Sequence, residues 1–355
     1  MKIVVPGSKS ETNRVLLMAA LCDSDVRIKN YLICEDSLFM LNALRKFGVH
    51  IEKISESEIV VSGCSGKFSI PDEVINVGNA GTTTRFLLAA SCLARCKFTL
   101  RGNKYMIKRP NDILIKVLKS LGAKIETKIV EGKYIDFIVD GKGLKGGRVK
   151  MPGNISTQFI TALLIIAPLL DEGLEITITS ELLSQPYLAL TLKILEAFGI
   201  SVKNEAFRRF GVSGRQTYRC NSYEIHGDAS SATYFLAWSM LHEKPVSLNI
   251  SRESGQGDFF FVDVMKEMGG KYTETGQGIE FFPHKEMKPY TGDLSHMPDT
   301  VPTLAIVAAT VPGKTTIKNI GHLRYKECDR LEAITHNLAI LGIMASNLSH
   351  SLYRK

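Results

Sequence analysis

The sequence predicts an α/β protein made of repeated units that close into two globular domains. Two helix patterns, each recurring five times, and strand-like stretches between them support this prediction. The chain has 355 residues with 45% hydrophobic content, which is enough to bury one large core or two medium ones. Because the repeat spacing is too long for an ordinary solenoid, we expect closed packing of the units rather than an open array.

The first helix pattern is a turn of small polar residues followed by an Ala-rich apolar stretch. Its five starts are spaced 72, 74, 74 and 70 residues apart. Free backbone N–H groups at helix starts attract anions, so five starts around one cleft would form a strong anion site. Taken singly, Ser156, Ser230 and Thr300 are better explained as plain helix caps. The five markers are Ser10, Thr82, Ser156, Ser230 and Thr300.

The second helix pattern is an amphipathic stretch that ends in glycine. These glycines are spaced 74, 77, 70 and 73 residues apart, and each is placed where a helix C-cap favours a left-handed residue. Alternating stretches such as "SEIVVSG", "YIDFIVDG" and "GIEFFP" follow and predict strands. Each unit therefore contains two helices and a sheet for them to cover. The five glycines are Gly48, Gly122, Gly199, Gly269 and Gly342.

Charge and cysteine usage restrict the functional class. Lys and Arg number 44 against 36 Asp and Glu, a net charge of +8, and the cations are scattered. This balance favours small anionic substrates over nucleic acid, because no binding motif accompanies the charge. Seven cysteines without paired CxxC spacing argue against a zinc site or a disulfide framework. The opening "KIVV" and the interrupted apolar runs lead us to expect a cytoplasmic protein with no membrane partner.

The stretch "VPGSKSETNR" at residues 5–14 is the first candidate anion site. It contains Gly-Ser-Lys-Ser but lacks the glycine spacing of a Walker A loop. Ser10 and Arg14 are four residues apart and share a helix face, and Lys9 lies at the helix entrance. These side chains could reach a phosphate and a carboxylate. A solvated basic helix start explains this segment equally well.

Two further basic stretches carry candidate residues. Arg109 in "IKRPND" precedes a proline, which predicts extended backbone ahead of a helix, and a surface role is equally compatible with it. In "LRYKECDRLEAI", the sequence spacing predicts Lys326, Glu327 and Arg330 on one helical turn. An ordinary surface ion pair between Glu327 and Arg330 is the alternative, worth about 0.3–0.5 kcal/mol.

Nine motifs, in order and spacing, resemble the enolpyruvyl transferases over positions 1 to about 342. Within that family they resemble the branch whose acceptor is shikimate 3-phosphate. The branch acting on UDP-N-acetylglucosamine carries a catalytic-loop cysteine in a Pro-Cys context, which this sequence lacks. The motifs are "PGSKSETNR", "NAGTTTR", "KRP", "STQFITALL", "SQPY", "GDASSATYF", "GQGD", "MPDTVPTLA" and "RYKECDRL".

The resemblance implies two domains, each an inside-out α/β barrel of three βαβαββ-type units. One domain would span residues 10–226, and the other would combine 1–9 with 227–355. After Gly342 the sequence loses the expected pattern, and a sixth helix start would fall near residue ~373. We therefore expect five of six units. A UDP-sugar transferase, or an impaired or non-catalytic anion-binding form, remains an alternative.

The implied reaction moves the enolpyruvyl group of phosphoenolpyruvate to the 5-hydroxyl of shikimate 3-phosphate and releases phosphate. It needs no metal or other cofactor, and we expect a monomer. The resemblance implies that Asp299, Glu327 and Lys9 are catalytic. It implies shikimate 3-phosphate contacts at Lys9, Ser10, Arg14, Ser156, Thr157, Gln158, Ser184, Asp299, Lys326 and His322, the last in place of the usual Asn. It implies phosphoenolpyruvate contacts at Lys9, Gly81, Arg109, Gln158 and Arg330.

Overall fold

The computed structural model describes residues 1–69, 73–94, 96–141, 143–348 and 351–354. The backbone divides into two compact units. We call Lys9–Ile225 the central unit, and Met1–Ser8 with His226–Lys355 the terminal unit. The domain boundaries expected from the sequence stay a prediction.

One strand plan is repeated throughout the described residues, which form five four-stranded sheets. In each sheet a first and a second strand are parallel, the second strand pairs antiparallel with the fourth, and the fourth pairs antiparallel with the third. From β5 to β8 the chain runs strand, helix, strand, helix, strand, strand. The predicted α/β class and βαβαββ unit are confirmed.

The central unit carries three of the described sheets. Its strands are β2 (Asp25–Lys29), β3 (Ile51–Lys53), β4 (Glu58–Ser62), β5 (Ile75–Gly78), β6 (Lys97–Asn103), β7 (Lys124–Val130), β8 (Tyr134–Asp140), β9 (Gly147–Met151), β10 (Leu174–Ile178), β11 (Lys203–Glu205), β12 (Arg209–Val212) and β13 (Ser222–Glu224). Its helices are α1 (Lys9–Leu21), α2 (Glu35–Lys46), α3 (Gly81–Ser91), η1 (Met106–Lys108), α4 (Asp112–Ser120), α5 (Thr157–Ile166), η2 (Ala167–Leu169) and α6 (Gln185–Ala197).

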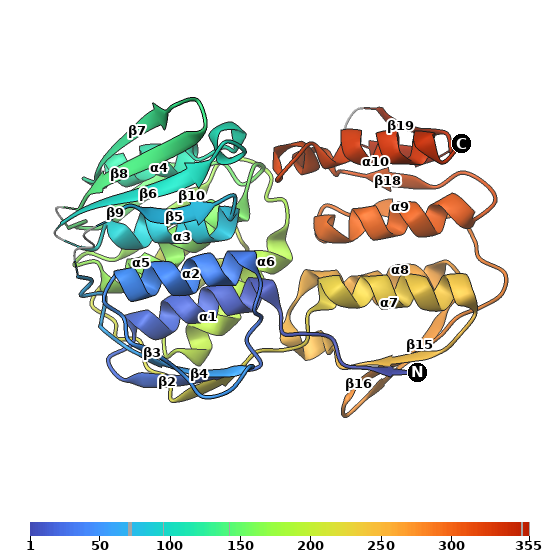
Figure 1. The fold of residues 1–355 in the computed structure, drawn as a ribbon, viewed down its shortest axis with the longest axis horizontal. Helices are drawn as coiled ribbons and strands as arrows, with labels where there is room; N and C mark the ends of the chain where they lie inside the picture. The colour runs from blue at the N-terminus through green and yellow to red at the C-terminus, as the bar shows by residue number, and fades with distance from the viewer. Residues whose placement is uncertain (70–72, 95, 142, 349–350, 355) are drawn as a thin grey trace. The chain divides into compact units, whose positions relative to one another are not determined.

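The helices of the central unit lie inside its sheets. Figure 1 shows the sheets of β2–β4 and β6–β8 on opposite sides of the helices. Helices α1, α3 and α5 are buried along almost their whole length, because apolar residues occupy most of each helix after its polar first turn. Strand β2 alternates exposed and buried residues, with Val26 and Ile28 facing the core. This packing fixes the helix starts, where the candidate residues lie.

The terminal unit carries two of the described sheets. Its strands are β1 (Lys2–Ile3), β14 (Val246–Leu248), β15 (Lys271–Thr275), β16 (Gly278–Phe282), β17 (Thr291–Asp293), β18 (Thr316–Lys318), β19 (Ala345–Leu348) and β20 (Ser351–Arg354). Its helices are α7 (Ala229–His242), η3 (Arg252–Ser254), η4 (Gly257–Phe260), α8 (Phe261–Glu267), η5 (Pro298–Thr300), α9 (Val301–Thr310), η6 (Gly321–Tyr325) and α10 (Arg330–Ile340). None of the helices in the described part of the chain is long and apolar enough to cross a membrane.

The first strands of two sheets come from distant parts of the chain. Strand β1 at the N-terminus pairs with β14 in the terminal unit. Strand β13, at the end of the central unit, pairs with β2 and completes the first sheet. The chain therefore crosses between the units twice, after Ser8 and after Ile225.

The glycine pattern read from the sequence is confirmed, while one reading near the end of the sequence is wrong. All five predicted C-cap glycines have positive φ, from 75° at Gly342 to 120° at Gly269. The repeat pattern does not stop at Gly342, because β19 and β20 pair with each other and β20 pairs with β18. The short polar segment 345–354 has little apolar alternation, so its strands leave a weak signal in sequence.

Candidate functional site

The first helix of the central unit places Lys9, Ser10 and Arg14 as predicted. Helix α1 begins at Lys9, whose Nζ lies 3.7 Å from Asp36 Oδ2. Arg14 is only 2% exposed and donates from Nη1 to the Ser10 carbonyl at 2.8 Å. Burial lowers the pKa of Arg14 to about 10, so the guanidinium stays charged near neutral pH. The first turn of α1 thus holds the charged Arg14 guanidinium through the Ser10 carbonyl.

Arg14 is held by oxygen atoms of helix α6. Its Nε donates to Thr191 Oγ1 at 2.8 Å, and its Nη2 donates to the Tyr187 carbonyl at 3.3 Å. These acceptors are neutral, so they orient the guanidinium without cancelling its charge. A buried cation fixed in this way is suited to an anionic ligand.

Gly81 and Arg109, both predicted phosphoenolpyruvate contacts, are neighbours in the structure. Arg109 donates from Nη1 to the Asn79 carbonyl at 2.7 Å. A Cβ atom on Gly81 would lie only 2.6 Å from the Arg109 Cζ, so the glycine leaves room for the guanidinium. Arg109 itself has the extended backbone that its position before a proline predicts.

The third helix start brings Ser156, Thr157 and Gln158 together at the beginning of α5. Ser156 caps the helix by accepting from the Gln158 N–H at 3.3 Å, and Thr157 is buried. The Gln158 amide faces back toward α3, where its Nε2 donates to Thr82 Oγ1 at 3.0 Å. Two predicted helix starts, at Thr82 and Ser156, are therefore connected through one side chain.

Ser184 occupies a left-handed backbone conformation directly before α6. Its φ is 54° and its ψ is 37°, and its side chain is largely buried. Such conformations in non-glycine residues cost about 1–3 kcal/mol and cluster at ligand-binding sites. The role of Ser184 at the substrate stays a prediction.

The terminal unit gathers four predicted residues into one charged cluster. Asp299 Oδ1 accepts from Arg330 Nη1 at 2.7 Å and from Lys326 Nζ at 3.2 Å. Arg330 Nη2 also donates to Glu327 Oε2 at 2.7 Å. Burial opposes the charge on Arg330, but Asp299 and Glu327 together raise its pKa above the ordinary value. We name Asp299, Lys326, Glu327 and Arg330 the charged cluster.

The prediction that Lys326, Glu327 and Arg330 share one helical turn is wrong. Helix α10 begins at Arg330, with Asp329 capping it by accepting from the Glu332 N–H at 3.1 Å. Lys326 and Glu327 precede the helix, in the segment after η6. Because Asp329 is the N-cap, α10 does not extend back to Lys326 and Glu327. The i, i+4 spacing alone did not reveal this boundary. The segment between η6 and α10 brings Lys326 and Glu327 to Asp299 and Arg330 instead.

His322 is buried beside the charged cluster and stays neutral. Burial and the nearby Lys326 cation lower its pKa to about 4. A neutral imidazole has one donor and one acceptor nitrogen, so His322 retains hydrogen-bonding capacity. The N–H of neutral His322 can therefore donate a hydrogen bond to shikimate 3-phosphate, as the resemblance predicts.

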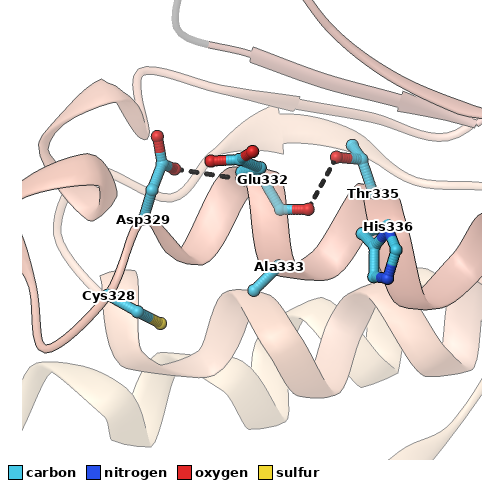
Figure 2. A pocket seen from close by; sticks show the side chains of 6 residues that line it. All are labelled: Cys328, Asp329, Glu332, Ala333, Thr335 and His336. Atoms are coloured by element: carbon cyan, nitrogen blue, oxygen red, sulfur yellow. Dashed lines mark hydrogen bonds between the residues drawn. The ribbon is translucent and has the colours of Figure 1, made fainter.

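A hollow of about 640 Å³ lies beside the first turns of α10 (Figure 2). Cys328, Asp329, Glu332, Ala333, Thr335 and His336 line it. Two of these six are carboxylates, which repel an anionic substrate, and the residues of the charged cluster do not appear among them. This hollow therefore contains none of the substrate-binding residues expected from the sequence.

Two of the predicted helix starts differ from plain caps. In α7 the cap is Asp228, which accepts from the Ser231 N–H at 2.7 Å, while Ser230 lies inside the first turn. Thr300 donates its hydroxyl to the Met297 carbonyl at 2.8 Å. The polar markers predict where these helices begin, but at α7 the acidic neighbour Asp228 is the cap, because Asp is a strong Ncap residue.

Sequence reasoning missed Arg85 on α3. This arginine is 3% exposed and donates to Gln158 Oε1, Asn111 Oδ1 and the Pro110 carbonyl. A signal was available, because Arg85 is the lone charge in "GTTTRFLLAAS", a helix that is otherwise uncharged. A buried cation needs specific partners, as Arg14 in α1 also shows.

Solved structures resemble the whole chain. EPSP synthase from Acinetobacter baumannii superimposes with a TM-score of 0.81 and 26% identity, covering 100% of this chain and 81% of that one. The fold is thus that of an enolpyruvyl transferase, with mixed sheets around buried helices.

Sequence comparisons then give the particular family. A 3-phosphoshikimate 1-carboxyvinyltransferase of Haemophilus influenzae (strain PittEE) is 41% identical over 346 residues, which cover 96% of this chain and 80% of the relative. The enzyme of the same name from Psychromonas ingrahamii is 39% identical over 347 residues. The family EPSP synthase (3-phosphoshikimate 1-carboxyvinyltransferase) matches residues 1–354, and the chain belongs to that family.

Proposed function

We propose that this chain transfers the enolpyruvyl group of phosphoenolpyruvate to the 5-hydroxyl of shikimate 3-phosphate and releases phosphate. The observation that carries the proposal is the family match across residues 1–354. Both substrates bear phosphate and carboxylate groups, which suits the cations of the two units. The relatives' names do not favour a UDP-sugar acceptor.

The central unit supplies the anion-binding residues in this proposal. Lys9, Ser10 and Arg14 bind shikimate 3-phosphate together with Ser184 and the start of α5. Gly81 and Arg109 bind phosphoenolpyruvate, with the Arg109 guanidinium fixed by the Asn79 carbonyl at 2.7 Å. Guanidinium groups whose orientation is already set lose little entropy on binding a phosphate or carboxylate. The residues proposed at the start of α5 are Ser156, Thr157 and Gln158.

The terminal unit supplies the acid and base groups. Asp299 takes the proton of the 5-hydroxyl, and Glu327 acts with Lys9 as proton donor and acceptor at C3 of phosphoenolpyruvate. Lys326 Nζ and Arg330 Nη1 lie 3.2 and 2.7 Å from Asp299 Oδ1 and hold that carboxylate in a fixed orientation. Proton transfer by positioned side chains contributes roughly 10²–10⁴-fold in rate.

Three properties complete the proposal. Lys326 and His322 contact shikimate 3-phosphate, and Arg330 contacts phosphoenolpyruvate. The protein acts in the cytoplasm as a monomer on small anionic substrates, with no nucleic acid partner. Its reaction uses no metal or cofactor.

The test is a phosphate-release assay with each substrate alone and with both together. We expect release with phosphoenolpyruvate plus shikimate 3-phosphate, and background release with either one alone. Replacing shikimate 3-phosphate by UDP-N-acetylglucosamine serves as the acceptor control. Turnover with the UDP-sugar, or phosphate release from phosphoenolpyruvate alone, would contradict the proposal. Calorimetry that detects shikimate 3-phosphate binding without turnover would favour an anion-binding protein.

A further inference from the structure

We propose that Arg85 is a positioning residue that sets the orientation of Gln158 and of the Arg109 segment at once. This inference rests on the proposed function, because it concerns how that site is held in shape. Arg85 is placed at the middle of α3, between the starts of α3 and α5 and the segment that leads into α4.

Arg85 first fixes the amide of Gln158. Its Nη1 donates to Gln158 Oε1, and the other end of the same amide donates from Nε2 to Thr82 Oγ1 at 3.0 Å. An amide bonded on both sides has a defined orientation, since exchanging its oxygen and nitrogen would set donor against donor at Arg85. Arg85 thus holds the side chain of Gln158, which we propose binds both substrates.

Arg85 also fixes the backbone that carries Arg109. Its Nη2 donates to the Pro110 carbonyl at 2.9 Å, and its Nε donates to Asn111 Oδ1 at 3.3 Å. Asn111 in turn donates from Nδ2 to the Arg109 carbonyl at 3.2 Å. The Arg85 guanidinium therefore connects Gln158, proposed to contact both substrates, with the segment of Arg109, proposed to contact phosphoenolpyruvate.

The surroundings of Arg85 require a planar fork rather than a point charge. The guanidinium carbon lies 4.9 Å from the centre of the Phe159 ring, in position for a cation–π contact. Three oxygens around the plane accept from its three nitrogens. A lysine ammonium keeps the charge but cannot reach all three acceptors in that geometry.

The experiment compares Arg85→Lys and Arg85→Met with Arg101→Lys as the matched control. Arg101 belongs to the same unit and donates from Nε and Nη2 to Asp136 at 2.7 Å each, and Asp136 is not one of the proposed site residues. We expect kcat/KM for phosphoenolpyruvate to fall about 10- to 100-fold in both Arg85 variants. The KM of both substrates should rise. In Arg101→Lys, thermal stability should change while both KM values stay within twofold.

A double-variant cycle separates positioning from simple destabilisation. If Arg85 acts through Gln158, Arg85→Lys combined with Gln158→Ala should lose much less activity than the product of the two single losses. Losses that multiply, or Arg85→Lys kinetics equal to the parent at a lower melting temperature, would overturn the inference. A parent without two-substrate turnover overturns the proposed function instead, so the two failures are distinguishable.

Discussion

The two units hold their cations in different ways. In the central unit, Arg14 and Arg85 donate to hydroxyl, amide and carbonyl oxygens and are almost completely buried. In the terminal unit, Lys326 and Arg330 are bonded to carboxylates and are about one quarter exposed. Neutral acceptors preserve the positive field of a cation, whereas carboxylates cancel part of it and allow protons to move. The comparison separates buried arginines with neutral acceptors from half-buried cations that are paired with carboxylates.

The largest expected effect comes from the carboxylate at the centre of the charged cluster. Asp299→Asn removes the proposed base and leaves the amide as a poor proton acceptor. We expect kcat for phosphate release to fall about 10²–10⁴-fold, with KM changed much less. Steady-state kinetics with both substrates measures this. Glu332→Gln removes a carboxylate from α10 outside the cluster and should leave kcat within about twofold. Equal activity of parent and Asp299→Asn would show that Asp299 is not the base.

The next effect is a pH dependence of stability from His322. Its folded pKa of about 4 lies below the unfolded value of 6.5, so between these pH values the unfolded chain binds a proton that the folded chain does not. Stability therefore falls as the pH drops from 6.5 towards 4, by up to about 3 kcal/mol. Urea unfolding of the parent and of His322→Asn at pH 7 and pH 4.5 measures it.

The control for this prediction is the difference between the two proteins at each pH. We expect His322→Asn to lose less stability on acidification than the parent. Asp299, Lys326, Arg330 and Asp293 also influence this histidine, and their charges are shared by both proteins. Parallel pH profiles would show that the protonation of His322 does not cause the loss of stability.

A smaller effect should follow from filling the space beside Arg109. Gly81→Ala would place a methyl group against the guanidinium and displace it. We expect KM for phosphoenolpyruvate to rise about 10- to 100-fold, because displaced positioning groups lose orientation. The matched control is Gly211→Ala on β12, where an added Cβ meets only an ordinary contact at 3.7 Å. If Gly81→Ala binds phosphoenolpyruvate like the parent, Arg109 is not held there for this substrate.

The smallest expected effect is a loss of stability at the acceptor of Arg14. Thr191→Val removes the hydroxyl that accepts from Arg14 Nε at 2.8 Å and leaves a buried donor unsatisfied. The free energy of unfolding should drop by about 1–2 kcal/mol, as measured by chemical denaturation. Thr191→Ser retains the hydroxyl and should recover most of that loss. Similar losses in the valine and serine variants would mean that packing, rather than the bond to Arg14, matters at this position.

The sequence predicted the repeated unit well because its signals are local. Glycine at each helix end and polar residues at each helix start report backbone conformation directly, and Gly48 and Gly122 have the expected positive φ. The bonds of Arg85 join residues 25, 26 and 73 positions apart, so only the packed helices reveal them. The charged cluster was found by resemblance, but its loop geometry depends on the Asp329 cap, which residue spacing does not report.

The pairing of strands that are distant in sequence, β1 with β14 and β2 with β13, has a consequence for folding during protein synthesis. The Val5 N–H bonds Asn249 Oδ1 across 244 positions, whereas the Asn30 side chain reaches the Ile225 carbonyl across 195. Because the ribosome synthesises the chain from its N-terminus, residues 9–225 can fold as soon as β13 has emerged and can pair with β2. The first residues must wait for β14, so the order of synthesis favours completing one unit before the other begins.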